Sequence, residues 1–368
     1  MKCNNLCKFA SEKKDMTPTV TEAKIHRLES MLEAASKVSV VTHTRPDGDA
    51  IGSTSAMVCL LRGLGKDAML LLPDGYPDNL AFVTGETCEG HIMRCDRDPD
   101  AVKARIAGSD LVIGMDLSGF DRAEGMQEAL QASRAAKLLI DHHIDPQKKD
   151  FDLVFSQTEI SSTCELLYYI LIATKWAGGD ASKLPMPALR ALMTGMTTDT
   201  NNFANSVFPS TFEMASRLLE AGVDRDGILS ELYNRFRENR LRMTGHLVKD
   251  NMRILPSGVS YIVVRRSELE EYDIRDGETE GIVNMPLTLD KVRMSIFLRE
   301  DDGFFRVSIR SKRGTSAFRL ASTRFHGGGH EQAAGGRLYF PGDIADASMA
   351  EEFIERVTED YFKTEDEN

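Results

Sequence analysis

The stretch Leu138-Leu139-Ile140-Asp141-His142-His143-Ile144 places an acid and two imidazoles directly after three apolar residues. The apolar residues predict a buried strand, and ligands bind at the carboxyl ends of strands in an open α/β sheet. The stretch is therefore a candidate part of a metal site. Taken alone it could equally be a surface acid followed by two ordinary histidines, so its meaning depends on what other segments bring to the same edge.

Strand and helix patterns alternate around this stretch. Short apolar or β-branched runs predict strands at 38–42, 68–72, 111–115, 137–140 and 153–155. Helical spacing of apolar residues predicts helices at 21–37, 51–64, 163–173, 187–197, 210–221 and 226–248. This alternation predicts an α/β fold with a mostly parallel sheet and helices on both faces. Ser162 and Glu165 have the spacing of a capping box at the start of one of these helices.

The pattern of predicted elements changes after residue 251. Strands are predicted at 261–264, 292–298 and 305–309, and a Gly-rich segment and an amphipathic C-terminal helix follow them. We expect a smaller α/β domain with a mixed sheet in this part. The predicted organisation is a loose tail over 1–20, a first domain over 21–225, a helical linker over 226–250 and a second domain over 251–368.

The composition bounds the class of protein. The chain has 368 residues, of which 42% are apolar and 28% are charged, as in soluble globular proteins. No apolar run approaches the roughly 18 residues that span a bilayer, and the N-terminus lacks the apolar core of a signal peptide, so we expect a cytoplasmic protein. The six cysteines form no paired C-x-x-C arrangement, which favours reduced structural thiols.

The charge is distributed unevenly. The net charge is −12, yet residues 304–340 contain seven Arg or Lys and one acid, a local balance of +6. The acidic remainder argues against a binder of long nucleic acid, whose phosphates require a basic surface. One basic patch on an acidic protein suits a small anionic ligand.

Four segment ends supply acids and imidazoles that a doubly wound fold would bring to one edge. They are His43, Asp47 and Asp49; Asp116; Asp141, His142 and His143; and Asp199. Each has a structural alternative, because Pro46-Asp47-Gly48 is a good turn sequence and the other acids could cap loops. Together they indicate a metal site.

Electrostatics supports that interpretation. Each close pair of carboxylates repels by about 4 kcal/mol at an effective dielectric constant near 20. Two divalent cations would balance four such charges, and a site rich in carboxylates with some imidazoles suits Mn²⁺ or Mg²⁺. Two adjacent metals can neutralise both the attacking and the leaving oxygen in a phosphoryl transfer.

A second cluster lies in the basic segment. Arg310 can hold a phosphate through two hydrogen bonds, and the glycines before His330 let backbone N–H groups approach a phosphate. A helix start after the glycines would add its dipole. The alternative is a Gly-rich turn with an incidental histidine.

The order of these motifs resembles the DHH phosphoesterase family with its DHH-associated C-terminal domain. The resemblance rests on HTRPDGDA (43–50), GMDLSGFDR (114–122), DHH (141–143), TTDT (197–200) and GGGHEQAAGG (327–336), and it covers most of residues 25–340. Within the family the chain is most similar to the branch of short-oligonucleotide ribonucleases and pAp phosphatases. Glu331-Gln332 stand where members often carry Lys-Asn, which leaves ligand preference open.

The resemblance implies roles for the site residues. One metal would be held by His43, Asp47 and Asp116, and a second by Asp49, Asp116, His142 and Asp199. His143 would face the scissile phosphate, and Asp141 would orient the histidines. Arg310, Gly328, Gly329 and His330 would hold the terminal phosphate or base from the second domain.

We therefore expect a two-metal phosphohydrolase that cleaves short oligonucleotides to 5′-mononucleotides or removes the 3′-phosphate of pAp. A cyclic-dinucleotide phosphodiesterase is the main alternative, and a pyrophosphatase or a nucleotide sensor without turnover is a weaker one. The expected partners are short oligonucleotides or small phosphorylated nucleotides, without long duplex nucleic acid or a membrane. The sequence leaves the number of subunits open, with a homodimer as one option.

Overall fold

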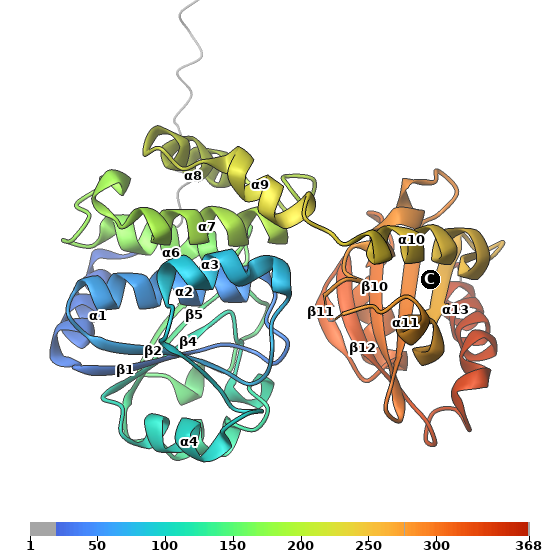
Figure 1. The fold of residues 1–368 in the computed structure, drawn as a ribbon, viewed down its shortest axis with the longest axis horizontal. Helices are drawn as coiled ribbons and strands as arrows, with labels where there is room; N and C mark the ends of the chain where they lie inside the picture. Colours follow the sequence, from blue (N-terminus) through green and yellow to red (C-terminus); the bar gives the residue numbers. More distant parts are fainter. Residues whose placement is uncertain (1–19, 276, 367–368) are drawn as a thin grey trace, which may run out of the picture. The chain divides into compact units, whose positions relative to one another are not determined.

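The computed structural model describes residues 20–366 apart from residue 276, so the tail predicted over 1–20 lies outside the described residues except for Val20. The chain divides into two compact units, Met1–Asn234 and Arg235–Asn368 (Figure 1). None of the helices in the described part combines the length and apolar character that spanning a bilayer requires. Among the cysteines that the structure describes, Cys59, Cys88, Cys95 and Cys164 are free thiols.

The first unit contains a six-stranded parallel sheet in the order β3-β2-β1-β4-β5-β6, which confirms the predicted parallel sheet. The strands are β1 (Lys37–Val41), β2 (Asp67–Leu72), β3 (Ile92–Arg94), β4 (Leu111–Met115), β5 (Ala136–Asp141) and β6 (Leu153–Ser156). Prediction missed β3, whose three residues are only half-buried and form no apolar run. The strand order reverses between β1 and β4, and such a switch point is where open α/β sheets bind ligands.

Helices cover both faces of this sheet, as predicted (Figure 1). The helices described in this unit are α1 (Glu22–Ala34), α2 (Gly48–Gly63), α3 (Ala81–Thr87), α4 (Pro99–Ala107), α5 (Gln127–Ala132), α6 (Thr163–Ala173), α7 (Met186–Asp199), α8 (Pro209–Glu220) and α9 (Arg225–Tyr233). Of these, α8 and α9 pack on α7 and not directly on the sheet. Side chains alternate along β5, so Leu138 and Ile140 join the core under α2 while Leu139 joins the core under α4. The apolar part of the opening stretch is therefore buried on both faces.

Glycines let α2 and α7 approach closely. A Cβ on Gly48 would lie 2.2 Å from Oγ1 of Thr198, and one on Gly52 would lie 2.6 Å from the carbonyl oxygen of Ala191. A Cβ on Gly195 would lie 2.2 Å from Sγ of Cys164. This close packing fixes the start of α2 against the end of α7, where three of the candidate ligands (Asp47, Asp49 and Asp199) stand.

The helix predicted over 226–248 is in fact two helices. α9 ends at Tyr233, and α10 (Glu238–His246) begins after a break in the helix. A five-residue π-helix over Leu247–Asn251 then follows α10 directly. Arg237 is extended before α10 because its guanidinium binds the carboxylates of Asp273 and Glu278. These tertiary ion pairs override the local helical pattern.

The second unit contains a mixed sheet, as predicted, in the order β11-β12-β10-β9-β8-β7. The strands are β7 (Arg253–Ile254), β8 (Val259–Val264), β9 (Met294–Asp301), β10 (Phe304–Ser311), β11 (Gly328–His330) and β12 (Ala333–Tyr339). β8 pairs with β9 in parallel, whereas β9–β10, β10–β12 and β11–β12 are antiparallel. The helices of this unit are α10, α11 (Arg266–Glu271), α12 (Ala317–Arg324) and α13 (Ala350–Asp366).

The Gly-rich segment is a β-hairpin made of β11 and β12, so the helix start that would have added its dipole does not follow the glycines. The glycines permit a backbone approach that side chains would block. A Cβ on Gly327 would lie 1.9 Å from the carbonyl oxygen of Gly335, and one on Gly336 would lie 2.2 Å from that of Phe325. The glycines thus serve strand and backbone packing, and no helix dipole follows them.

Candidate active site

The loop after β1 carries His43, which is buried and has one ring nitrogen committed to the backbone. Its Nδ1 lies 2.9 Å from the carbonyl oxygen of Thr44, which can only accept, so Nδ1 carries the proton. In the neutral ring Nε2 is then the nitrogen with the lone pair, and it lies 3.6 Å from Oδ2 of Asp116. Burial lowers the pKa of His43, but Asp116 and Asp47 outweigh it and the pKa is raised.

Asp47 is exposed and begins α2. Its Oδ1 accepts hydrogen bonds from the backbone N–H groups of Asp49 (3.0 Å) and Ala50 (3.1 Å). Oδ1 of Asp47 therefore has the structural role in the turn that the sequence suggested as an alternative. Oδ2 is the oxygen that could bind a cation. His43, Asp47 and Asp116 each offer a ligand atom, and these atoms lie within 4.8 Å of one another.

Asp49 is buried against the start of α6. Its Oδ2 accepts from the backbone N–H of Thr163 at 2.7 Å, and its Oδ1 accepts from that of Cys164 at 2.8 Å. The positive end of the helix thus faces a carboxylate. Burial first, and then the charges of Asp116 and Asp47, raise the pKa of Asp49 well above its ordinary value. That crowding of carboxylates is the condition a bound cation would relieve.

Thr163 is a site residue that sequence reasoning missed. Besides its backbone bond to Asp49, its Oγ1 donates to Oδ1 of Asp116 at 3.0 Å. The available signal was the predicted capping box, and only half of that box forms. The hydroxyl of Ser162 accepts a hydrogen bond from the backbone N–H of Glu165, as in a capping box. The Glu165 carboxylate, however, accepts from the backbone N–H of Ser161 and not from that of Ser162, as a full capping box would require.

Asp116 stands at the centre of the site. It follows β4 with φ 53°, in the left-handed region that aspartate tolerates better than most residues. Its Oδ1 lies 3.6 Å from Nε2 of His142 and 3.4 Å from Nδ1 of His143. Burial alone would raise its pKa, but the charge of His143, the hydrogen bond with His43 and then the charges of His142 and His43 hold the pKa well below its ordinary value.

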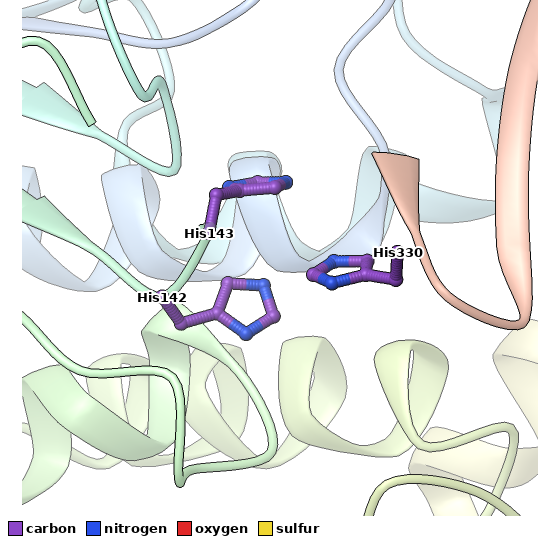
Figure 2. A group of neighbouring side chains, drawn as sticks. All are labelled: His142, His143 and His330. Atoms are coloured by element: carbon purple, nitrogen blue, oxygen red, sulfur yellow. The ribbon is translucent and has the colours of Figure 1, made fainter. Parts of the chain in front are cut away.

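His142 and His143 leave the end of β5 with different partners, and their rings are 4.9 Å apart and tilted by 60° (Figure 2). Nδ1 of His143 donates to Oδ1 of Asp141 at 2.9 Å, because a carboxylate only accepts. Burial lowers the pKa of His143, but Asp116 and Asp141 outweigh it and raise the pKa to about 9. Burial instead dominates at His142, and its pKa is lowered.

Nε2 of His142 faces three carboxylates. It lies 3.6 Å from Asp116, 3.8 Å from Asp49 and 3.6 Å from Oδ2 of Asp199, which ends α7. Asp49, Asp116 and His142 form a second group of ligand atoms within 4.8 Å, so Asp116 belongs to both groups. Asp199 is next to the second group because its Oδ2 lies close to Nε2 of His142.

These donor sets fit divalent cations. Both groups combine carboxylate oxygens with an imidazole nitrogen, which suits Mn²⁺ or Mg²⁺ and offers no thiolate. Asp141 is fully buried, and its Oδ2 has no hydrogen-bond partner among the described residues. The site as a whole is therefore rich in negative charge that cations would balance.

The second unit gathers the remaining candidates on one side of its sheet. Arg310 of β10 pairs with Ala333 of β12, and Gly328, Gly329 and His330 form β11 on the other side of β12. Nη1 of Arg310 donates to the carbonyl oxygen of Ile309 at 3.0 Å. The substrate residues predicted from the sequence thus lie on β10 and β11, the two strands that pair with β12. Figure 2 shows His330 at the end of β11.

Comparison with known proteins places the chain in a family. Residues 37–196 match the N-terminal domain of the DHH family, and residues 258–360 match the DHHA1 domain. The chain belongs to the DHH family.

Its relatives include the probable bifunctional oligoribonuclease and PAP phosphatase NrnA of Streptococcus mutans, 28% identical over 84% of this chain and 91% of that protein. The NrnA of Bacillus subtilis is 27% identical over 84% and 91%. A solved structure of an exopolyphosphatase-related protein from Bacteroides fragilis is 31% identical, has a TM-score of 0.85 and spans 94% of this chain and 98% of its own.

Proposed function

We propose that the chain is a two-metal phosphohydrolase that releases 5′-mononucleotides from short oligoribonucleotides and removes the 3′-phosphate of pAp. The observation that carries the proposal is the pair of ligand groups that share Asp116 at the switch point of the sheet. The substrate class is supported by relatives named as bifunctional oligoribonucleases and PAP phosphatases, which match along most of their length.

In this proposal His43, Asp47 and Asp116 hold one cation, and Asp49, Asp116, His142 and Asp199 hold the other. Two such cations, when bound, would neutralise charge on the phosphoryl oxygens as the bond to phosphorus breaks. Manganese is the cation we expect first, with magnesium as the alternative.

The protein residues position the substrate in this proposal. Since Nδ1 of His143 donates to Asp141, Nε2 is the ring nitrogen that would donate to a phosphoryl oxygen. Asp141 therefore orients His143 and does not contact the substrate itself. Thr163 keeps Asp116 oriented through its hydroxyl. Arg310, Gly328, Gly329 and His330 would contact the terminal phosphate or base from the second unit.

Other expectations from the sequence stay predictions. They include the cytoplasmic location, the homodimer and the division into a catalytic domain over 21–225, a linker over 226–250 and a substrate-binding domain over 251–368. Cleavage of a cyclic dinucleotide stays an alternative that the substrate panel below addresses.

The test is a substrate panel with the purified chain and Mn²⁺, containing pAp, a 5′-phosphorylated dinucleotide, a cyclic dinucleotide and pyrophosphate. We expect release of phosphate from pAp and of mononucleotide from the dinucleotide. Turnover of only the cyclic dinucleotide or of pyrophosphate would contradict the substrate assignment. If no substrate is turned over while metal occupancy is verified, the proposal that the chain is a phosphohydrolase is refuted.

Asp199→Asn is the variant to pair with that panel, because Asp49 also binds the start of α6 and its loss would disturb the fold. Replacing even outer partners of a metal site costs about 10–100-fold, so we expect a loss of at least about 100-fold in kcat/KM. Asp226→Asn, on the exposed face of α9, is the matched control and should keep full activity. Equal rates for both variants would remove Asp199 from the ligand set.

A further inference from the structure

Phe318 is an aromatic side chain that the core of the second unit does not need. It lies in the first turn of α12, whose N-cap Ser316 accepts from the N–H of Arg319 at 3.1 Å. The other apolar residues of the helix, Ala317, Leu320 and Ala321, are buried, whereas Phe318 exposes 43% of its surface. Its exposure thus has no explanation in the packing of α12.

The ring of Phe318 lies beside the Gly-rich hairpin. The backbone N–H of Ala317 donates to the carbonyl oxygen of Glu331 at 2.7 Å, which ties the start of α12 to the turn between β11 and β12. A Cβ on Gly328 would lie 3.9 Å from Cε2 of Phe318, within van der Waals contact. The exposed ring and the strand that carries the proposed substrate residues therefore share one surface.

Apart from Phe318, the exposed residues of α12 are polar or cationic, and the exposed acid Glu331 stands in the neighbouring hairpin turn. The exposed neighbours in α12 are Arg319, Ser322, Thr323 and Arg324, and the helix contains no acid. A docking surface for another protein would show further apolar side chains around the ring. An exposed aromatic side chain on an element with exposed arginines is instead a combination with which proteins bind single-stranded nucleic acid, because every base has a face that can stack.

We propose that Phe318 stacks on a nucleobase of the substrate and makes the enzyme discriminate in favour of oligonucleotides that carry that base. The proposal rests on the proposed function, since it assigns the ligand of the Gly-rich hairpin to a nucleotide. Stacking of one base on an aromatic side chain changes affinity by about 5- to 150-fold when the aromatic residue is removed.

The kinetic test compares the wild type with Phe318→Ala on a 5′-phosphorylated dinucleotide and on two analogues that each lack one base. We expect kcat/KM to fall by about 5- to 150-fold for the dinucleotide, and to stay unchanged for the analogue that lacks the stacked base. Phe318→Tyr should keep the wild-type rate, and Leu241→Ala, another exposed apolar residue of this unit at 74% exposure, serves as control. Equal losses on all three ligands, or no loss on any, would overturn the proposal.

A second measurement does not depend on turnover. The chain has a single tryptophan, Trp176, in the first unit, so Phe318→Trp adds one fluorescent reporter next to the hairpin. With metal chelated, we expect the dinucleotide to quench the added emission and the analogue without the stacked base to leave it unchanged. If the wild type hydrolyses nothing, this quenching alone decides. Its absence would then overturn the stacking assignment separately from the failure of the enzyme.

Discussion

Gly195 is a position at which a single methyl group should strain the packing around the site. It lies on α7 where that helix meets α2 and α6. A Cβ there would lie 2.2 Å from Sγ of Cys164, 3.0 Å from the carbonyl oxygen of Gly48 and 3.1 Å from Cα of Asp49. Cys164 is fully buried, so its thiol cannot move aside into solvent.

Overpacking of a core costs about 1–3 kcal/mol, and we expect Gly195→Ala near the upper end because backbone atoms confine the methyl on a second side. Removing the opposing thiol should relieve most of the strain. Cys164→Ala alone should cost about 1 kcal/mol for the lost contacts of the thiol. The double variant should then lose less free energy of unfolding than the two single variants lose together, by at least about 1 kcal/mol.

The assay is urea unfolding followed by the fluorescence of Trp176, which reports on the first unit alone. Gly63→Ala is the matched control, since it is a glycine of α2 with no atom within 4 Å of an added Cβ. It should be neutral or slightly stabilising. Additive losses for Gly195→Ala and Cys164→Ala would refute the reasoning, because they would show that the methyl and the thiol do not compete for the same space.

Two further predictions concern polar groups. Thr163→Val should weaken Mn²⁺ binding by about 10–100-fold, because it removes the hydroxyl that donates to Asp116; calorimetric titration measures this, and unchanged affinity would contradict it. His246 lies between Glu268 and Asp250, which raise its pKa above 6.5, so its contribution to stability is complete below that value and is lost as pH rises through the raised pKa. The melting temperature of His246→Gln should therefore fall further below the wild type at pH 6 than at pH 9, and an equal gap at both values would argue against the pairing.

The sequence predicted the sheet and the candidate ligands because both follow from local patterns. Apolar runs such as 111–115 and 137–140 become buried strands, and in a parallel sheet the residues that follow such strands meet at one edge. His43, Asp116 and His142 could be found in this way. β3 could not, because three half-buried residues at the edge of the sheet carry too little apolar pattern.

The residues that support the ligands could not be predicted, since their partners are distant in the chain. Thr163 lies 114 residues beyond the carboxylate of Asp49 that its N–H binds, and its own neighbourhood indicated only the start of a helix. The same holds for Phe318, whose significance comes from the strand beside it and not from α12. Local patterns describe the element that a residue belongs to, whereas these roles depend on packing between elements.

The difference between His142 and His143 shows where that limit lies within the opening stretch itself. Both are imidazoles, and their residue types alone gave no reason to separate them, so only the family resemblance assigned His142 to a metal and His143 to the phosphate. In the structure the separation follows from what each ring nitrogen meets: Nδ1 of His143 is committed to Asp141, while Nε2 of His142 faces carboxylates that come from α2, β4 and α7. A ligand needs an unprotonated nitrogen directed at the cation, and a donor needs its proton held outward by a partner on the other nitrogen. The buried carboxylate of Asp141 holds Nδ1 of His143, and in the proposed function this directs Nε2 of His143 at the substrate while His142 serves as the metal ligand.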